Sequence, residues 1–222
     1  MAMRRAARVL AAGIVFASVA DVTGSNAAFF SFPMALRSQL AQIRFSEPVL
    51  APMAHVRFCL RYAEDCQIKS VDFRRRNFAL TAERWNELNE VNRAVNRDIV
   101  PQPNLGGLAN EEWIVSPPAG DCNDYAVTKR HLLLAKGWPS RALLLAEVVV
   151  PSGEHHLVVV VRTKEGDIVL DNLNANIRTV AMTRYQYKWV RVESPYNPKY
   201  WSSVNMPGPV HVAVSFDESG AQ

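Results

Sequence analysis

The sequence predicts an α+β fold in which N-terminal helices pack on an antiparallel sheet. Three observations support this fold class. Two segments before residue 137 have helical periodicity, several short strand-like segments follow residue 140, and the two kinds of segment do not alternate. Helices followed by an antiparallel meander are typical of α+β domains.

The clearest predicted helix begins at Thr81 and is stopped by Pro101. Its apolar residues recur at spacings of three and four, at Trp85, Leu88, Val91, Val95 and Ile99. Its polar side carries three asparagines, Asn89, Asn92 and Asn96. Asparagine is unusual inside a helix, so these side chains are either solvated or hydrogen-bonded to a neighbouring loop.

A second helix is predicted over residues 127–136, with Gly137 as its C-cap. The loop before it, from Pro101 to Gly120, contains several prolines and glycines, and loops of that length are usually functional or disordered. The strands that follow are predicted at 141–150, 156–162 and 167–170, and around Tyr185, Tyr187 and Trp189. Turns at 151–153 and 164–166 separate the first three strands.

The N-terminus has the pattern of a signal peptide. Arg4, Arg5 and Arg8 precede an apolar run over residues 9–20, which is too short for a membrane span of about 20 residues. We therefore expect residues 1–28 to be a signal peptide, cleaved after Ala20 or near Ala27 and Ala28. The mature protein would then be periplasmic or secreted, whereas an uncleaved membrane anchor is the alternative.

The rest of the chain is expected to form one domain. Residues 29–49 have no clear period and are expected to be irregular, with one short helix around 35–43, while 50–215 form the domain and 216–222 a tail. Loss of the three N-terminal arginines lowers the formal net charge of +4 to +1. The remaining basic cluster at residues 74–76 is typical of a solvated surface, so no nucleic-acid partner is expected.

The three cysteines divide into a pair and a single residue. Cys59 and Cys66 flank a short polar loop, and we expect a disulfide between them, since disulfides persist in an exported protein. Cys122 is left over. A single remaining thiol in such a protein is either an intermolecular partner or a reactive group.

Cys122 lies at the expected start of a helix, after a Gly-Asp pair. Unpaired backbone N–H groups and the helix dipole stabilise a thiolate there, so we expect a lowered thiol pKa. The same N–H groups can bind the oxyanion that forms when a thiolate attacks a carbonyl. A buried, inert cysteine is the structural alternative.

His156 and Asp171 are candidates for the base and its orienting acid. His156 begins one predicted strand and Asp171 follows the next, so a hairpin around residues 164–166 would bring them together. His155 competes for the role of base. Because neighbouring residues of a strand face opposite ways, only one of the two histidines can face Cys122, and the spacing alone does not choose between them.

Two longer stretches make the sequence recognisable. Gly-Asp-Cys-Asn-Asp-Tyr-Ala, and then His-Leu-Val-Val-Val-Val-Arg-Thr-Lys-Glu-Gly-Asp-Ile-Val-Leu-Asp-Asn-Leu, resemble the bacterial transglutaminase-like cysteine proteinases, the family of the LapG-type periplasmic proteases. The resemblance covers roughly residues 50–202. In that family the histidine opens the strand that leads to Arg-Thr and the aspartate precedes Asn-Leu, which selects His156 and Asp171.

The resemblance implies a papain-like, transglutaminase-like fold and peptide-bond hydrolysis by a Cys122, His156 and Asp171 triad. For LapG-type members it further implies Ca²⁺, a large adhesin as substrate and an inner-membrane receptor that sequesters the enzyme. The family places its calcium ligands beside the nucleophile, which corresponds to Asp121, Asn123 and Asp124. Asn123 stands where the family usually has Glu, so one ligand charge is missing and the calcium affinity should be lower.

Two other functions use the same residues. Transglutamination and deamidation pass through the same kind of acyl-enzyme, and the sequence does not decide whether water or an amine accepts the acyl group. A catalytically silent binding module is the third candidate, and the presence of all three triad residues argues against it.

Overall fold

The computed structural model describes residues 41–67, 79–107 and 110–206. The helices are α2 Met53–Arg61, η2 Ala63–Cys66, α3 Ala82–Asp98, α4 Cys122–Ala135, η3 Ser140–Ala142 and α5 Val180–Thr183. The strands are β1 Arg44–Val49, β2 Val100–Pro101, β3 Ala119–Gly120, β4 Leu143–Val149, β5 His155–Arg162, β6 Asp167–Leu170, β7 Arg178–Thr179, β8 Lys188–Glu193 and β9 Trp201–Asn205. The predicted α+β class is confirmed.

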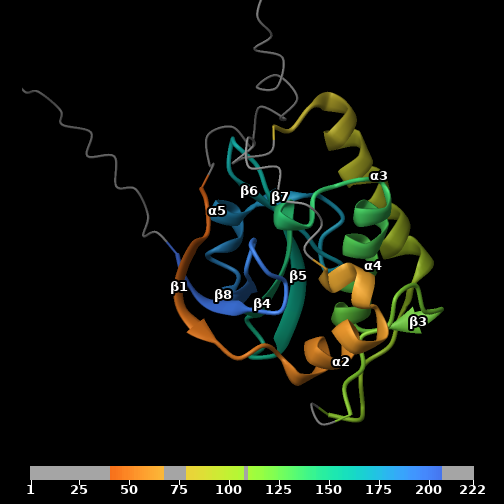
Figure 1. Cartoon of the computed structure of the whole chain (residues 1–222). Coiled ribbons are helices and arrows are strands. Elements are labelled where there is room, and N and C mark those ends of the chain that lie inside the picture. The colour runs from red at the N-terminus through yellow and green to blue at the C-terminus, as the bar shows by residue number, and fades with distance from the viewer. Residues whose placement is uncertain (1–40, 68–78, 108–109, 207–222) are drawn as a thin grey trace, which may run out of the picture.

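Seven of these strands form one sheet in the order β1-β9-β8-β4-β5-β6-β7, and every neighbouring pair is antiparallel (Figure 1). Strands β4, β5 and β6 make the predicted meander, and β5 pairs with β6 across the predicted turn at 164–166. The short strands β2 and β3 pair in parallel and connect the end of α3 to the start of α4.

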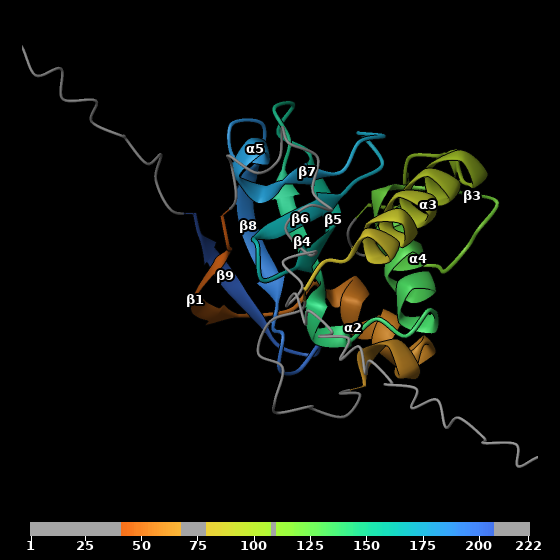
Figure 2. The same cartoon turned by 90° about the horizontal axis from the view of Figure 1, so that it is seen from above.

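The sheet has an apolar core on each face. Helices α2, α3 and α4 gather on one side of it, as Figure 2 shows. Alternation along β5 separates the two cores: Leu157, Val159 and Val161 pack with the three helices, whereas Val158 and Val160 pack in the second core. The middle strands are therefore buried on both faces, which explains their continuous runs of Leu and Val.

Helix α3 has the predicted apolar stripe, with Leu88, Val91, Val95 and Ile99 buried. Thr81 is its N-cap and accepts a hydrogen bond from the N–H of Arg84. The end of α4 also agrees with the sequence, because Gly137 has a φ of 84°, the left-handed conformation typical of a residue that follows a helix. The helical pattern over residues 127–136 is shorter than α4, which begins at Cys122, where the helix start was expected.

Two further boundaries were wrong. Residues 44–49 were expected to be irregular but form β1, which pairs with β9 at the edge of the sheet. The fourth strand begins at Lys188, so Tyr185 and Tyr187 both precede it, and the side chain of Tyr185 is exposed whereas that of Tyr187 is buried. The expected signal peptide, the first part of the short helix expected at 35–43 and the C-terminal tail lie outside the described residues. Among the described helices, none combines the length and apolar character of a membrane span.

Candidate active site

Cys122 is held at the first turn of α4 by a capping box. The carboxylate of Asp121 accepts the N–H of Asn123 at 2.9 Å, and the carboxylate of Asp124 accepts the N–H of Asp121 at 3.1 Å. Gly120 is required beside it, because a Cβ at that position would lie 2.2 Å from an oxygen of Asp124. Gly120, Asp121 and Asp124 therefore fix the start of α4 at Cys122.

The environment of the Cys122 thiol differs from the sequence expectation. Burial, and to a smaller extent the carboxylates of Asp121, Glu111 and Glu154, raise the pKa of the thiol to about 12. A hydrogen bond from the backbone N–H of Leu157 lowers the pKa but does not offset these effects. The expected low pKa was wrong, because the loss of hydration and the nearby negative charges outweigh the start of the helix.

The thiol reaches β5 close to His156. The N–H of Leu157 belongs to the peptide that joins it to His156, so the contact with Cys122 is at the start of this strand. Strand β6 pairs with β5 only from Val159 onwards. The thiol therefore meets the β5 backbone just beyond the point where β6 ends.

His156 and Asp171 form a buried hydrogen-bonded pair, with Nε2 of the histidine 2.9 Å from Oδ1 of the aspartate. Leu170 lies opposite Val159 in the sheet, so Asp171 follows at the level of Val158, on the face that His156 shares. The pair uses Nε2, which leaves Nδ1 of His156 to exchange a proton with another group.

The carboxylate of Asp171 has four partners. Oδ1 accepts the bond from His156 and a bond of 3.0 Å from the N–H of Leu173, while Oδ2 accepts a bond from the hydroxyl of Tyr187 and lies 3.6 Å from Nη2 of Arg178. Burial raises the pKa of Asp171, but the bonds from His156, Tyr187 and Leu173 lower it by more, so the net shift is downward. Asp171 therefore remains ionised although it is buried.

The asparagines of α3 support the same region. Asn96 donates to the carbonyl of Asp171 at 3.0 Å, and Asn92 donates to the carbonyl of Ala175 at 3.2 Å. Asn89 bonds to a carbonyl of its own helix. Two of the three asparagines thus bind the loop that follows β6, which is the loop-bonded alternative predicted from the sequence. The bond from Asn96 holds the backbone of Asp171 against α3.

His155 has a different partner. Its Nδ1 contacts the carboxylate of Glu147, which also contacts Arg191, and its side chain is more than half exposed. Alternation along β5 places it on the opposite face from His156. Of these two neighbouring histidines, His156 is the one with a buried ring and a buried carboxylate partner.

Lys129 is a buried cation of this region that the sequence analysis did not single out. It lies two turns after Cys122 on α4, is 1% exposed, and has Nζ 6.0 Å from the centre of the Tyr125 ring. Burial lowers its pKa to about 7, and the charge of Asp171 opposes this shift. Lys129 therefore changes charge near neutral pH within the field of Asp171.

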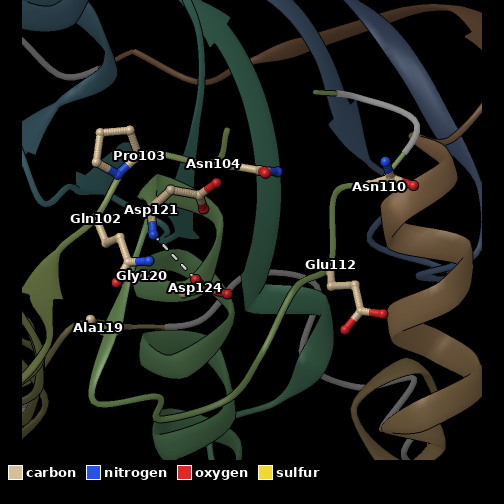
Figure 3. A pocket seen from close by; sticks show the side chains of 9 residues that line it. All are labelled: Gln102, Pro103, Asn104, Asn110, Glu112, Ala119, Gly120, Asp121 and Asp124. Carbon is tan, nitrogen blue, oxygen red and sulfur yellow. Dashed lines mark hydrogen bonds between the residues drawn. The ribbon is translucent and has the colours of Figure 1, made fainter. Parts of the chain in front are cut away.

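A cavity of about 300 Å³ lies beside the start of α4 (Figure 3). Its nine described lining residues are Gln102, Pro103, Asn104, Asn110, Glu112, Ala119, Gly120, Asp121 and Asp124. Three of these carry carboxylates and three carry amides, while none is cationic. Burial raises the pKa of Asp124 to about 6, and the charges of Asp121 and Glu111 act in the same direction. These oxygen donors suit a hard cation such as Ca²⁺.

Asn123 does not line this cavity, although it was a predicted calcium ligand. Its Nδ2 donates to Oε1 of Glu111 at 2.7 Å, and the same oxygen accepts the indole N–H of Trp113 at 2.7 Å. Glu112 does line the cavity, from the long loop before α4. The structure therefore brings Asp121 and Asp124 together and directs Asn123 toward Glu111, while the carboxylate of Glu112 pairs with Arg61 at 3.2 Å.

Cys59 and Cys66 form the predicted disulfide, with their Cα atoms 5.5 Å apart. Together with His55 they are the one group of three or more His, Cys, Asp or Glu side chains in the described residues whose ligand atoms converge within 4.8 Å. Because both sulfurs are consumed in the disulfide, this group does not provide thiolate ligands for a metal.

The disulfide also fixes a contact with α4. It closes the turn that contains Asp65, whose carbonyl accepts Nη1 of Arg130 at 2.7 Å. The Asp65 carboxylate lies 3.0 and 3.1 Å from Nδ1 of His131. Both partners lie on α4, so the disulfide-closed turn braces the helix that carries Cys122.

Four residues of this region were not identified as functional from the sequence, namely Glu111, Lys129, Arg178 and Tyr187. Tyr187 was recognised only as part of an alternating aromatic pattern. Lys129 had a usable signal, because it follows Cys122 by seven residues and so lies on the same face of α4. Glu111 and Arg178 have no local signal, because tertiary packing brings their segments to the site.

Similarity to known proteins identifies the family of this chain. The family model described as bacterial transglutaminase-like cysteine proteinase matches residues 45–208. A search of curated proteins finds no match. Among solved structures, Legionella pneumophila LapG is 26% identical, with a TM-score of 0.41 over 48% of this chain and 62% of that protein. A calcium-bound form of LapG is 21% identical, with a TM-score of 0.47 over 59% of this chain and 74% of that protein.

The aligned region thus spans less than two thirds of the first LapG structure. The family model, in contrast, extends from β1 to just past the end of β9, and it includes Cys122, His156 and Asp171. It covers most of the 222 residues. The chain therefore belongs to the bacterial transglutaminase-like cysteine proteinases.

Proposed function

We propose that this cysteine proteinase is an exported endopeptidase in which Cys122 is the nucleophile, His156 the general base and Asp171 the residue that orients His156. The observation that supports these roles best is the buried bond between His156 and Asp171, next to the strand position where the Cys122 thiol contacts the backbone. Cys122 is also the one cysteine outside the disulfide.

The geometry supports a stepwise acyl transfer. Nδ1 of His156 takes the thiol proton as the sulfur attacks the substrate carbonyl carbon, and Asp171 stabilises the imidazolium. The backbone N–H of Cys122, at the start of α4, can donate to the resulting oxyanion. The imidazolium then gives its proton to the leaving amine, and water attacks the thioester with His156 again as base, which releases the acid and restores the thiol.

The raised thiol pKa assigns a specific task to His156. A thiol with a pKa of about 12 is neutral near pH 7, so its proton must leave during the attack rather than before it. The substrate also displaces water from the site, which strengthens the electrostatic effect of Asp171 on the imidazolium. Proton transfer and attack are thus coupled in this proposal.

We also propose that Ca²⁺ binds in the cavity, with Asp121 and Asp124 as ligands. A bound cation would supply positive charge close to the carboxylates of Asp121 and Glu111, which raise the thiol pKa. Asp121 and Asp124 also cap α4, so their position is fixed before a metal binds.

The proposed location is the periplasm or the cell exterior, and the proposed substrate is an exported or surface protein. The N-terminal signal pattern and the Cys59–Cys66 disulfide both support export. A large adhesin is the first substrate class to test, and an inner-membrane protein that sequesters the enzyme is the proposed partner.

The test is an N-terminal proteomics comparison of surface and secreted proteins exposed to wild-type enzyme or to Cys122→Ala. New protein termini that require Cys122 would support endopeptidase activity. If no termini appear but glutamine side chains gain an amine or lose ammonia, amide transfer or deamidation replaces peptide hydrolysis. Binding of a surface protein without any covalent change would indicate a silent binding module.

A further inference from the structure

The residues beyond His156 and Asp171 carry one further inference, which rests on the function proposed above. We propose that Tyr187, held by Arg178, is a positioning residue that fixes the Asp171 carboxylate so that Oδ1 stays on His156. Tyr187 contacts neither the thiol nor the reacting carbonyl in this scheme. It acts on His156 through Asp171.

The two carboxylate oxygens of Asp171 bind different partners. Oδ1 accepts bonds from Nε2 of His156 at 2.9 Å and from the N–H of Leu173 at 3.0 Å. Oδ2 accepts the hydroxyl of Tyr187. A carboxylate held at only one oxygen can rotate about its Cβ–Cγ bond. The bond from Tyr187 opposes this rotation and keeps Oδ1 directed at the imidazole.

Arg178 determines the direction of the Tyr187 bond. Nη2 of Arg178 lies 3.2 Å from the Tyr187 hydroxyl oxygen, and its guanidinium lies 5.5 Å from the centre of the ring. Guanidinium groups only donate, so the hydroxyl accepts from Arg178 and its own proton is directed to Asp171. Arg178 also contacts the side chain of Gln186, the residue before Tyr187.

Tyr187 also shields the pair from water. Its side chain is buried at 5% exposure, and its ring centre lies 6.0 Å from that of His156. The ionisable groups that face Asp171 are His156, Arg178, Tyr187 and Lys129. Burial raises the pKa of Tyr187 to about 12, so its hydroxyl still donates at alkaline pH, whereas Lys129, with a pKa of about 7, loses its charge.

The experiment uses iodoacetamide on the disulfide-intact protein, in which Cys122 is the one free thiol. At pH 7 alkylation needs His156 to remove the proton, whereas at about pH 10 hydroxide forms the thiolate directly. We expect Tyr187→Phe to slow labelling about tenfold at pH 7, since a supporting hydrogen bond to a catalytic group is lost, and to leave the rate at about pH 10 unchanged. Arg178→Gln should act in the same direction.

Tyr185→Phe is the matched control, because it removes the hydroxyl of an exposed tyrosine two residues away. The inference is overturned if Tyr187→Phe behaves like this control, or if it changes labelling equally at both pH values, as a purely structural defect would. His156→Ala and Asp171→Asn distinguish failure of the proposed triad from failure of the positioning role of Tyr187. If they leave the pH 7 rate unchanged, the triad itself is wrong. If they slow it while Tyr187→Phe and Arg178→Gln do not, only the positioning role fails.

Discussion

The two halves of the candidate site differ in how well their charges are balanced. We call the residues around the nucleophile the thiol half and those around the base the imidazole half. The thiol half contains Glu111, Asp121, Cys122 and Asp124, and the imidazole half contains His156, Asp171, Arg178 and Tyr187. In the thiol half burial raises the pKa of both Cys122 and Asp124, and the negative charges of Asp121 and Glu111 act in the same direction. In the imidazole half the buried carboxylate has a lowered pKa.

This difference indicates where the site is already organised. Asp171 has donors for both oxygens before any substrate binds, so the imidazole half is preorganised for its charged state. The main charges that shift the Cys122 pKa, those of Asp121, Glu111 and Glu154, are all negative. The enzyme at rest is therefore expected to keep a neutral thiol, and the thiol half should respond most to an added cation.

The largest effect is expected for Cys122→Ala, which removes the nucleophile from the thiol half. Cleavage of the substrate found by proteomics should fall by at least about a thousandfold, since no other residue can form the acyl-enzyme. The measurement is the rate of appearance of the new N-terminus. Thermal unfolding of the variant should change little, because only one partly buried sulfur is lost, and activity close to wild type would exclude Cys122 as nucleophile.

Asp171→Asn tests the imidazole half and should lower the cleavage rate by about a thousandfold. An uncharged amide at residue 171 cannot stabilise the imidazolium as a carboxylate does. Its –NH₂ group would also face one of the donors that bind Asp171, such as the hydroxyl of Tyr187 or the N–H of Leu173. The matched control is Asp98→Asn, which changes an exposed aspartate on α3. A loss of rate in both variants, or in neither, would contradict the assigned role of Asp171.

Much of this arrangement follows from local patterns. The stripe of α3, the Gly137 cap and the hairpin of β5 and β6 each depend on residues close in sequence, and the Cys59–Cys66 disulfide closes a short loop. The hairpin alone is sufficient to bring His156 to Asp171. This is why the imidazole half could be outlined from the sequence.

The remaining features depend on tertiary packing. Tyr187 precedes β8 and Asp171 follows β6, and β4 and β5 lie between these two strands in the sheet, so no local pattern connects the two residues. The helix start at Cys122 correctly indicated the place of the thiol but not its pKa, which depends on burial and on Glu111 and Glu154 from other segments. Likewise, Glu112 reaches the cavity from a loop whose path could not be predicted.

Calcium binding should change the charge balance of the thiol half but not that of the imidazole half, because the proposed ligands Asp121 and Asp124 belong to the thiol half. Its affinity should fall about tenfold between pH 7 and pH 5, since Asp124, with a pKa of about 6, binds a proton in that interval and a protonated carboxylate is a poor ligand. Isothermal titration calorimetry at the two pH values measures this change, with Mg²⁺ as the ion control.

Asp121→Asn is the corresponding variant. Asparagine caps helices as well as aspartate does, so α4 should keep its start while the cavity loses one ligand charge. Calcium affinity should then fall by about tenfold at pH 7, since affinity follows ligand charge. An unchanged affinity in this variant would place the calcium site elsewhere.

The smallest effect is expected for Glu111→Gln in calcium-free buffer. The carboxylate of Glu111 raises the pKa of Cys122, so its removal lowers that pKa and increases the thiolate fraction at every pH below about 12. Iodoacetamide labelling at about pH 10 should become about two- to threefold faster, because the thiolate is the reactive form. Glutamine keeps a side-chain oxygen that can accept the bonds from Asn123 and Trp113.

Glu112→Gln is the control for this change, because it neutralises the adjacent carboxylate, which is not among the main causes of the Cys122 pKa shift. Its labelling rate should match that of the wild type when EGTA removes calcium. A rate increase confined to Glu111→Gln would show that a specific negative charge holds the thiol half in its neutral state. Equal rates in both variants would mean that the charge of Glu111 does not hold the thiol neutral, and that burial, Asp121 and Glu154 account for the raised pKa of Cys122.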